Sequence, residues 1–130
     1  MHSQTLGFRY LFNKDYQQAE TAFRTSLAST PTKASLLNGL AIALYRQGSL
    51  FEALNFARKA AVLLPRHVAY LHNLATICRD CGQWNEGEVA IRTALETTPR
   101  DARLHSILGQ ILTLDGKLAE AEHVFREAMM

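Results

Sequence analysis

Residues 34–65 read ASLLNGLAIALYRQGSLFEALNFARKAAVLLP, and this stretch decides the fold. Its apolar residues are spaced by three and four, first at positions 36, 37, 40, 41 and 44 and then at 53, 54, 57 and 61. Such spacing predicts two amphipathic helices of about 12 to 14 residues each. Gly48 separates the two helices, and Pro65 ends the second because its ring and missing N–H prevent a helix from continuing.

The same pattern of residues recurs along the whole chain at one fixed interval of 34 residues. It is carried by prolines, by glycines and by leucines: Pro31, Pro65 and Pro99; Gly48, Gly82 and Gly116; Leu6, Leu40, Leu74 and Leu108. A fixed period of this length indicates one supersecondary unit that is repeated, with each copy contacting mainly its neighbours. The sequence therefore predicts a single all-α domain over residues 1–130, a right-handed α-α superhelix of about eight antiparallel helices. The four repeats are expected at about 1–33, 34–67, 68–101 and 102–130.

These residues resemble the tetratricopeptide repeat, whose pattern is Trp-x2-Leu-Gly-x2-Tyr, then Ala-x3-Phe, then Pro. The first period matches this pattern with Leu6, Gly7, Tyr10, Ala19, Phe23 and Pro31. The fourth period matches it with Leu108, Gly109, Ala121 and Phe125, whereas the initial Trp is replaced in all four copies. The resemblance implies a non-catalytic scaffold or adaptor, in which the first helix of each repeat lines a concave groove. Such a groove takes an extended peptide or a helix of a partner protein.

Two local predictions concern the second repeat and the third. Ser49 and Glu52 have the Ser-x-x-Glu spacing of a capping box at the start of a helix. Cys78 and Cys81 form a lone Cys-x-x-Cys at the end of a helix, where the helix dipole has the wrong sign for a reactive thiol. Cys78 also stands at the place of Tyr10 in its repeat, which predicts a buried structural cysteine.

Composition and motifs exclude several classes of function. The net charge is +2 with Lys and Arg scattered, whereas a nucleic-acid binder normally has a basic face, so we expect no nucleic-acid partner. No apolar run approaches the roughly 18 to 20 residues that cross a bilayer, so we expect no membrane insertion. The five histidines show no ligand spacing and no catalytic constellation stands out, so we expect no metal, no cofactor and no enzyme activity. Two free thiols and the lack of a secretory signal favour the cytoplasm.

The expected groove is apolar and aromatic in its first half, and polar and partly cationic in its second. Its predicted partner-binding residues are Phe8, Asn38, Ile42, Tyr45, Arg46, His72, Asn73, Arg79, Arg103 and Gln110. The amide of Asn73 both donates and accepts, which suits a peptide backbone. The guanidinium groups of Arg46, Arg79 and Arg103 suit carboxylates, although each of them could equally be a solvated surface charge.

The last predicted helix has an apolar side with nothing after it to cover Phe125 and Met129. A solenoid normally needs a polar outer face on its terminal unit. Either the chain is a segment of a longer protein, which we favour, or it self-associates, end to end or as a dimer, through this exposed helix. A third alternative makes it the substrate-recruiting region of a larger enzyme.

Overall fold

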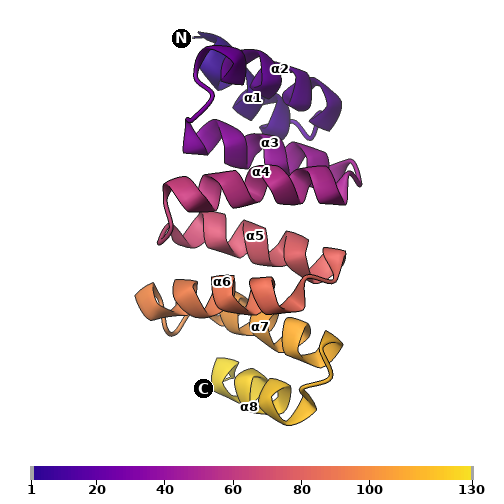
Figure 1. Ribbon diagram of the computed structural model, residues 1–130, viewed down its shortest axis with the longest axis vertical. Coiled ribbons are helices and arrows are strands. Elements are labelled where there is room, and N and C mark those ends of the chain that lie inside the picture. Colours follow the sequence, from indigo (N-terminus) through magenta and orange to yellow (C-terminus); the bar gives the residue numbers. More distant parts are fainter. Residues whose placement is uncertain (1, 130) are drawn as a thin grey trace. The chain divides into compact units, whose positions relative to one another are not determined.

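The computed structural model describes residues 2–129, and across these residues it contains eight α-helices and no strand. The chain divides into two compact units, Met1–Pro65 and Arg66–Met130, here called unit 1 and unit 2. Each unit holds four helices that follow one another as two antiparallel hairpins (Figure 1). The all-α fold predicted from the repeat is therefore confirmed.

Unit 1 consists of α1 (His2–Phe12), α2 (Tyr16–Ser29), α3 (Ala34–Arg46) and α4 (Leu50–Leu63). Unit 2 consists of α5 (Val68–Cys81), α6 (Trp84–Thr97), α7 (Ala102–Leu114) and α8 (Leu118–Ala128). Pro31 and Pro99 lie just after α2 and α6, as the sequence predicts. Within each unit the first helix of one repeat contacts the first helix of the next, α1 with α3 and α5 with α7.

All four first helices end in the same way. One or two positions after the helix, a residue has a positive φ: 61° at Lys14, 87° at Gly48, 76° at Gly82 and 81° at Gly116. The amide of the following residue then donates to a carbonyl five residues back, as Ser49 does to Leu44 at 2.9 Å and Gln83 to Cys78 at 2.9 Å. This is the Schellman arrangement, for which glycine is favoured because it lacks a Cβ. The first repeat makes the same turn with a lysine.

The starts of the second helices differ from the prediction. The side chain of Ser49 makes no cap hydrogen bond, so the predicted capping box is wrong. Glu52 instead accepts a hydrogen bond at 2.6 Å from Arg24 of the preceding repeat. An ion pair between charged groups is stronger than a hydrogen bond between neutral ones, and it draws the Glu52 side chain away from its own helix end.

In each unit an aromatic ring packs directly on a glycine. A Cβ added to Gly39 would lie 2.5 Å from the Phe23 ring, and one added to Gly7 would lie 2.6 Å from it. Phe23 is fully buried as a result. In unit 2 Phe125 covers Gly109 in the same manner, at 2.5 Å from an added Cβ. Cys78 is fully buried and is not disulfide-bonded, as predicted.

Candidate functional site

The surface made by the first helices is the candidate partner-binding face within each unit. The backbones of neighbouring first helices approach each other closely, whereas among the described residues the backbones of α2 and α4, and of α6 and α8, do not. Neighbouring repeats are therefore closest on the side of their first helices, and the surface bends toward that side. We call this surface the inner face, formed by α1 and α3 in unit 1 and by α5 and α7 in unit 2.

The inner face of unit 1 is largely apolar. Phe8 meets Phe23 edge to face, with 4.9 Å between ring centroids, and remains 39% exposed. Asn38, Ile42 and Tyr45 follow on α3 and are half-buried. These side chains belong to α1 and α3, the first helices of the two repeats in unit 1.

Arg46 at the end of α3 is engaged by an aromatic ring. Its guanidinium lies 5.3 Å from the centroid of Tyr16, and its Nε donates to the Tyr16 hydroxyl at 3.2 Å. A cation over an aromatic face is stabilised by about 0.5–1 kcal/mol at an exposed site. Arg46 is thus held in position by the preceding repeat.

The inner face of unit 2 brings together Arg79 and Gln110, which are 31 residues apart in the sequence. Arg79 Nη1 donates to Gln110 Oε1 at 2.6 Å, and its Nε donates to Asp80 Oδ1 at 2.9 Å. Gln110 is exposed. His72 and Asn73, which precede Arg79 on α5, are half-buried. This face therefore offers amides and a paired guanidinium to an incoming chain.

Arg103, at the start of α7, pairs with the residue that caps that helix. Asp101 accepts from the backbone N–H of Arg103 at 3.0 Å and from its guanidinium Nη2 at 3.2 Å. The hydrogen bond from the Arg103 side chain is the main cause that lowers the pKa of Asp101 below its usual value. Arg79 and Arg103 thus both face a carboxylate of their own chain, and an incoming carboxylate must compete with Asp80 or Asp101.

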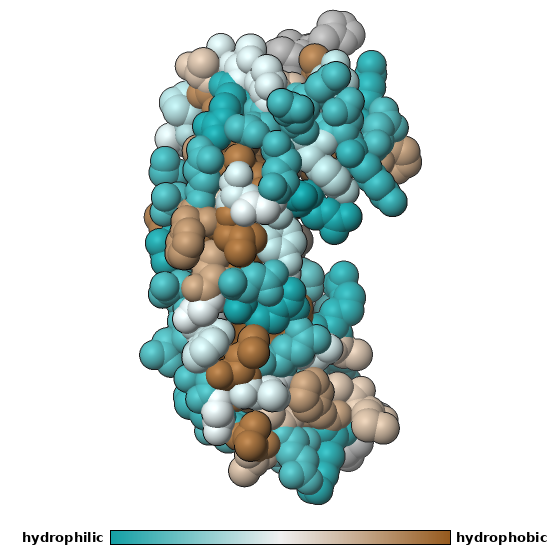
Figure 2. Space-filling view, turned by 90° about the vertical axis from the view of Figure 1, so that its right-hand side faces the viewer, coloured by the Kyte–Doolittle hydropathy of each residue, from teal (hydrophilic) through white to brown (hydrophobic). Residues whose placement is uncertain are grey.

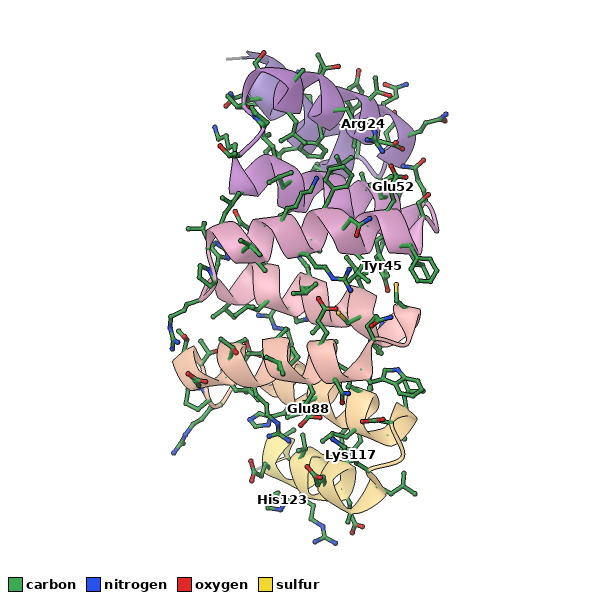
Figure 3. The ribbon with its side chains drawn as sticks, in the orientation of Figure 1. Arg24, Tyr45, Glu52, Glu88, Lys117 and His123 are labelled. Carbon is green, nitrogen blue, oxygen red and sulfur yellow. The ribbon has the colours of Figure 1, made fainter. Side chains whose placement is uncertain are left out.

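The second helices carry the same ion-pair arrangement in both units, and Figure 3 labels Arg24 and Glu52 of unit 1. Arg24 pairs with Glu20 of its own helix at 2.9 Å and with Glu52 of the next repeat at 2.6 Å. In unit 2, Arg92 pairs with Glu88 of its own helix and with Glu120 of the next repeat. The contacts of the second helices thus lie between repeats rather than on the inner face.

Glu88 receives a second cation, since Lys117 lies 3.2 Å from its carboxylate. Burial alone raises the pKa of Glu88, but hydrogen bonds from Arg92 and Lys117 outweigh burial and leave this pKa below its usual value. The hydrogen bond to Glu88 in turn raises the pKa of Lys117. This cluster links α6 to the start of α8.

His105 is a polar residue that sequence reasoning set aside. It is buried, and its Nε2 lies 2.8 Å from the carbonyl oxygen of Pro99, while its Nδ1 has no hydrogen-bond partner among the described residues. A carbonyl only accepts, so the His105 ring donates through Nε2. The available signal was positional, because His105 stands where Leu37 stands two repeats earlier.

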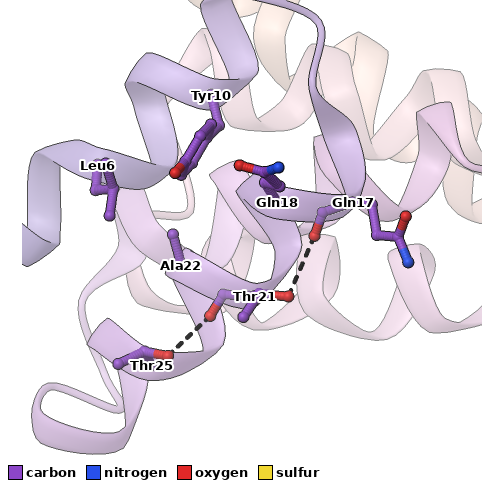
Figure 4. A pocket seen from close by; sticks show the side chains of 7 residues that line it. All are labelled: Leu6, Tyr10, Gln17, Gln18, Thr21, Ala22 and Thr25. Atoms are coloured by element: carbon purple, nitrogen blue, oxygen red, sulfur yellow. Dashed lines mark hydrogen bonds between the residues drawn. The ribbon is translucent and has the colours of Figure 1, made fainter.

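A hollow lies between α1 and α2 on the side that faces away from α3 and α4 (Figure 4). It is lined by Leu6, Tyr10, Gln17, Gln18, Thr21, Ala22 and Thr25. On the face seen in Figure 2, hydrophobic side chains form separate small patches among hydrophilic ones.

Within residues 2–129, no cluster of three or more His, Cys, Asp or Glu could hold a metal ion. None of the described helices has the length and apolar character needed to cross a membrane.

This architecture defines an all-helical repeat protein of the protein-interaction type. The family model described as "Anaphase-promoting complex, cyclosome, subunit 3" matches residues 12–94, and the chain belongs to that tetratricopeptide-repeat family. A second model, described as "Tetratricopeptide repeat", matches residues 73–129. The resemblance predicted from the sequence is confirmed. A search among curated proteins gives no match.

Solved structures similar to this chain include several with MamA in their titles. "Crystal structure of MamA protein" has a TM-score of 0.91 at 17% identity and covers 98% of this chain and 69% of that chain. "MamA 41-end from Desulfovibrio magneticus RS-1" has a TM-score of 0.89 at 18% identity, covering 97% and 71%. "MamA MSR-1 C2" has a TM-score of 0.87 at 18% identity, covering 97% and 72%. At this identity the likeness establishes the fold.

Proposed function

We propose that the chain is a non-catalytic scaffold that binds a peptide or helix of a partner protein on its inner face. The family and the fold support a protein-interaction scaffold. The observation that carries the finer proposal is the pairing of Arg79 with Gln110, which joins α5 and α7 across two repeats at a solvent-accessible point.

The chemistry of this face favours recognition through hydrogen bonds to a peptide backbone. Gln110 and Asn73 each carry an amide that donates and accepts. The nearby arginines are already matched by Asp80 and Asp101. A ligand that brings only a carboxylate therefore gains little, since it must displace an existing partner. We infer that an extended segment or helix with polar backbone or side-chain groups is the ligand that fits.

In unit 1 the inner face offers a different set of contacts. Phe8, Ile42 and Tyr45 are apolar or aromatic, and Asn38 adds one amide. An apolar side chain of the ligand is the group that suits this face. Cys78 and Cys81 form no disulfide, which favours a reducing compartment, and the cytoplasm stays our prediction.

A quantitative pull-down from lysate of the source organism tests the proposal. The bait variant is Asn73→Ala/Gln110→Ala, and the matched control is Asn85→Ala/Thr97→Ala, which changes two exposed positions on α6. Circular dichroism and a thermal melt establish that both baits are folded. A protein that is enriched by wild type and control but lost from the inner-face variant supports the proposal. Equal recovery of every protein by all three baits contradicts it.

A further inference from the structure

A hollow of about 310 Å³ lies in unit 1, between the segment that joins α2 to α3 and the second half of α4. Its lining residues are Pro31, Thr32, Leu37, Arg58, Lys59, Val62 and Leu63. All of them lie between positions 31 and 63, which places the hollow within one unit and away from both ends of the sequence. None of them is among the predicted partner-binding residues of the inner face, so the hollow is a separate site.

The wall that α4 gives to this hollow is apolar where other repeats have small or polar residues. Val62 is 77% exposed and Leu63 is 40% exposed. The equivalent positions hold alanine and serine in the first repeat (28–29), and glutamate and threonine in the third (96–97). The packing of repeats therefore does not require a large apolar side chain at either position. An exposed apolar group that is bordered by charged residues is typical of a contact site for a partner.

The charged residue at the border of the hollow is positioned by an aromatic ring. Lys59 is exposed, and its Nζ lies 5.0 Å from the centroid of the Phe56 ring, about one turn earlier on α4. Glu52, the acidic residue of the same helix, is bound to Arg24 at 2.6 Å. The contact with Phe56 holds the ammonium of Lys59 beside the hollow, where its N–H groups can donate to a carboxylate.

The charge of unit 1 favours an acidic ligand. Residues 1–65 contain seven lysines and arginines and three acidic residues, which gives a net charge of +4. Residues 66–130 contain seven lysines and arginines and nine acidic residues, which gives a net charge of −2. The position equivalent to Lys59 in unit 2 is Glu127, so the cation beside this hollow belongs to unit 1. A positive surface attracts an acidic segment and repels a basic one.

We propose that this hollow binds a segment of a partner protein in which a leucine-sized apolar side chain is flanked by aspartate or glutamate. The apolar side chain packs on Val62 and Leu63, and a flanking carboxylate accepts a hydrogen bond from Lys59. Ligand sites have volumes of about 300–1,000 Å³, so a hollow of about 310 Å³ takes one or two side chains of the segment. The ion pair is exposed to solvent, and the affinity therefore falls as the salt concentration rises.

Panning of a phage-displayed library of short random peptides on the full chain tests the proposal. Wild type is compared with Val62→Glu, which puts a carboxylate on an exposed wall of the hollow. The matched control is Val89→Glu, the same change at a valine of α6 that is 66% exposed. Circular dichroism establishes that all three proteins are folded. We expect a class of peptides that wild type and Val89→Glu retain and Val62→Glu loses, with an apolar residue flanked by Asp or Glu as their shared feature.

Fluorescence anisotropy with a labelled synthetic copy of such a peptide measures the size of each effect. Val62→Glu is expected to weaken binding at least about tenfold, because a carboxylate replaces an apolar wall and repels the acidic ligand. Lys59→Ala is expected to weaken it about two- to fivefold, the range of an exposed ion pair. A peptide with lysine in place of its acidic residues is expected to bind Lys59→Glu more tightly than wild type.

Two results of the panning overturn the proposal. One is that no enriched peptide depends on Val62. The other is that the peptides lost with Val62→Glu have basic or uncharged flanks, which indicates a contact made by the apolar wall without Lys59.

Discussion

Unit 1 and unit 2 share the ion pairs on their surfaces and differ in their interiors. Equivalent positions of the two units are 68 residues apart in the sequence, which allows a direct comparison. Arg24 with Glu52 corresponds to Arg92 with Glu120, and both pairs join neighbouring second helices. The interiors beneath these pairs are different: Phe23 packs on Gly39 in unit 1, where unit 2 has Ile91 and Ile107. The two units thus share the ion pairs between their second helices, while the volume beneath these pairs is filled in different ways.

The greatest expected effect comes from replacing Gly39 of unit 1 with isoleucine, the residue at the equivalent position 107 of unit 2. Gly39→Ile places a branched side chain where an added Cβ already lies 2.5 Å from the Phe23 ring. We expect a loss of about 3 kcal/mol in the free energy of unfolding, the upper part of the range for overpacking. Urea unfolding followed by circular dichroism measures it.

The double variant Gly39→Ile/Phe23→Ile sharpens the comparison, because it recreates the Ile–Ile pair of unit 2. It is expected to recover part of the loss, with a coupling of about 1 kcal/mol or more between the two sites. Recovery is incomplete because Phe23 also fills the space at Gly7. Strictly additive losses would show that the two side chains do not compete for one volume.

The second effect concerns Leu37 and His105, two buried residues that occupy equivalent positions in unit 1 and unit 2. His105→Leu removes a buried ring nitrogen that lacks a partner, at the cost of one hydrogen bond to the exposed Pro99. We expect a gain of about 1 kcal/mol in unfolding free energy. Leu37→His in unit 1 is expected to cost about 2 kcal/mol, because it buries a polar ring among apolar neighbours. A loss of stability in His105→Leu would mean that the bond to Pro99 outweighs the unpartnered nitrogen.

The third effect concerns the turn after the first helix. Lys14 has a φ of 61°, whereas its counterpart Gly82 has a φ of 76°. A residue with a Cβ is strained in this left-handed region by about 1 kcal/mol. Lys14→Gly is therefore expected to raise the melting temperature, with a gain of about 1 kcal/mol or less. Gly82→Ala serves as the reciprocal variant and is expected to lower it.

The smallest effect is a dependence on pH that belongs to unit 2. The folded pKa of Glu88 lies below its usual value of 4.5, so its contribution to stability is present above that pH. This contribution is lost as the pH falls through the lower folded pKa. Glu88→Gln is expected to cost less than about 1 kcal/mol at pH 7 and to flatten the decline of stability in acid. Parallel stability profiles for variant and wild type would contradict the assignment.

The repeat made most of the fold predictable, because proline and glycine mark helix ends for local reasons. Gly48 and Pro65 follow the ends of α3 and α4, as predicted. The capping box at Ser49 was wrong because Glu52 pairs with Arg24, a residue 28 positions away whose proximity depends on helix packing. The pairs of Arg79 with Asp80 and of Arg103 with Asp101 are different, because their partners are sequence neighbours that the sequence analysis did not consider. Residue type indicates what a side chain can bind, and packing decides which partner reaches it first.

Site-specific photocrosslinking is the most direct test of the central claim that the inner face binds a partner. Gln110→p-benzoylphenylalanine places the probe on the inner face of unit 2, and Asn85→p-benzoylphenylalanine places it on the exposed side of α6. Both variants are irradiated in lysate of the source organism, and adducts are identified by mass spectrometry. The account predicts a discrete protein adduct at position 110 that is missing at position 85. An adduct at position 85 alone, or the same adducts at both positions, would contradict it.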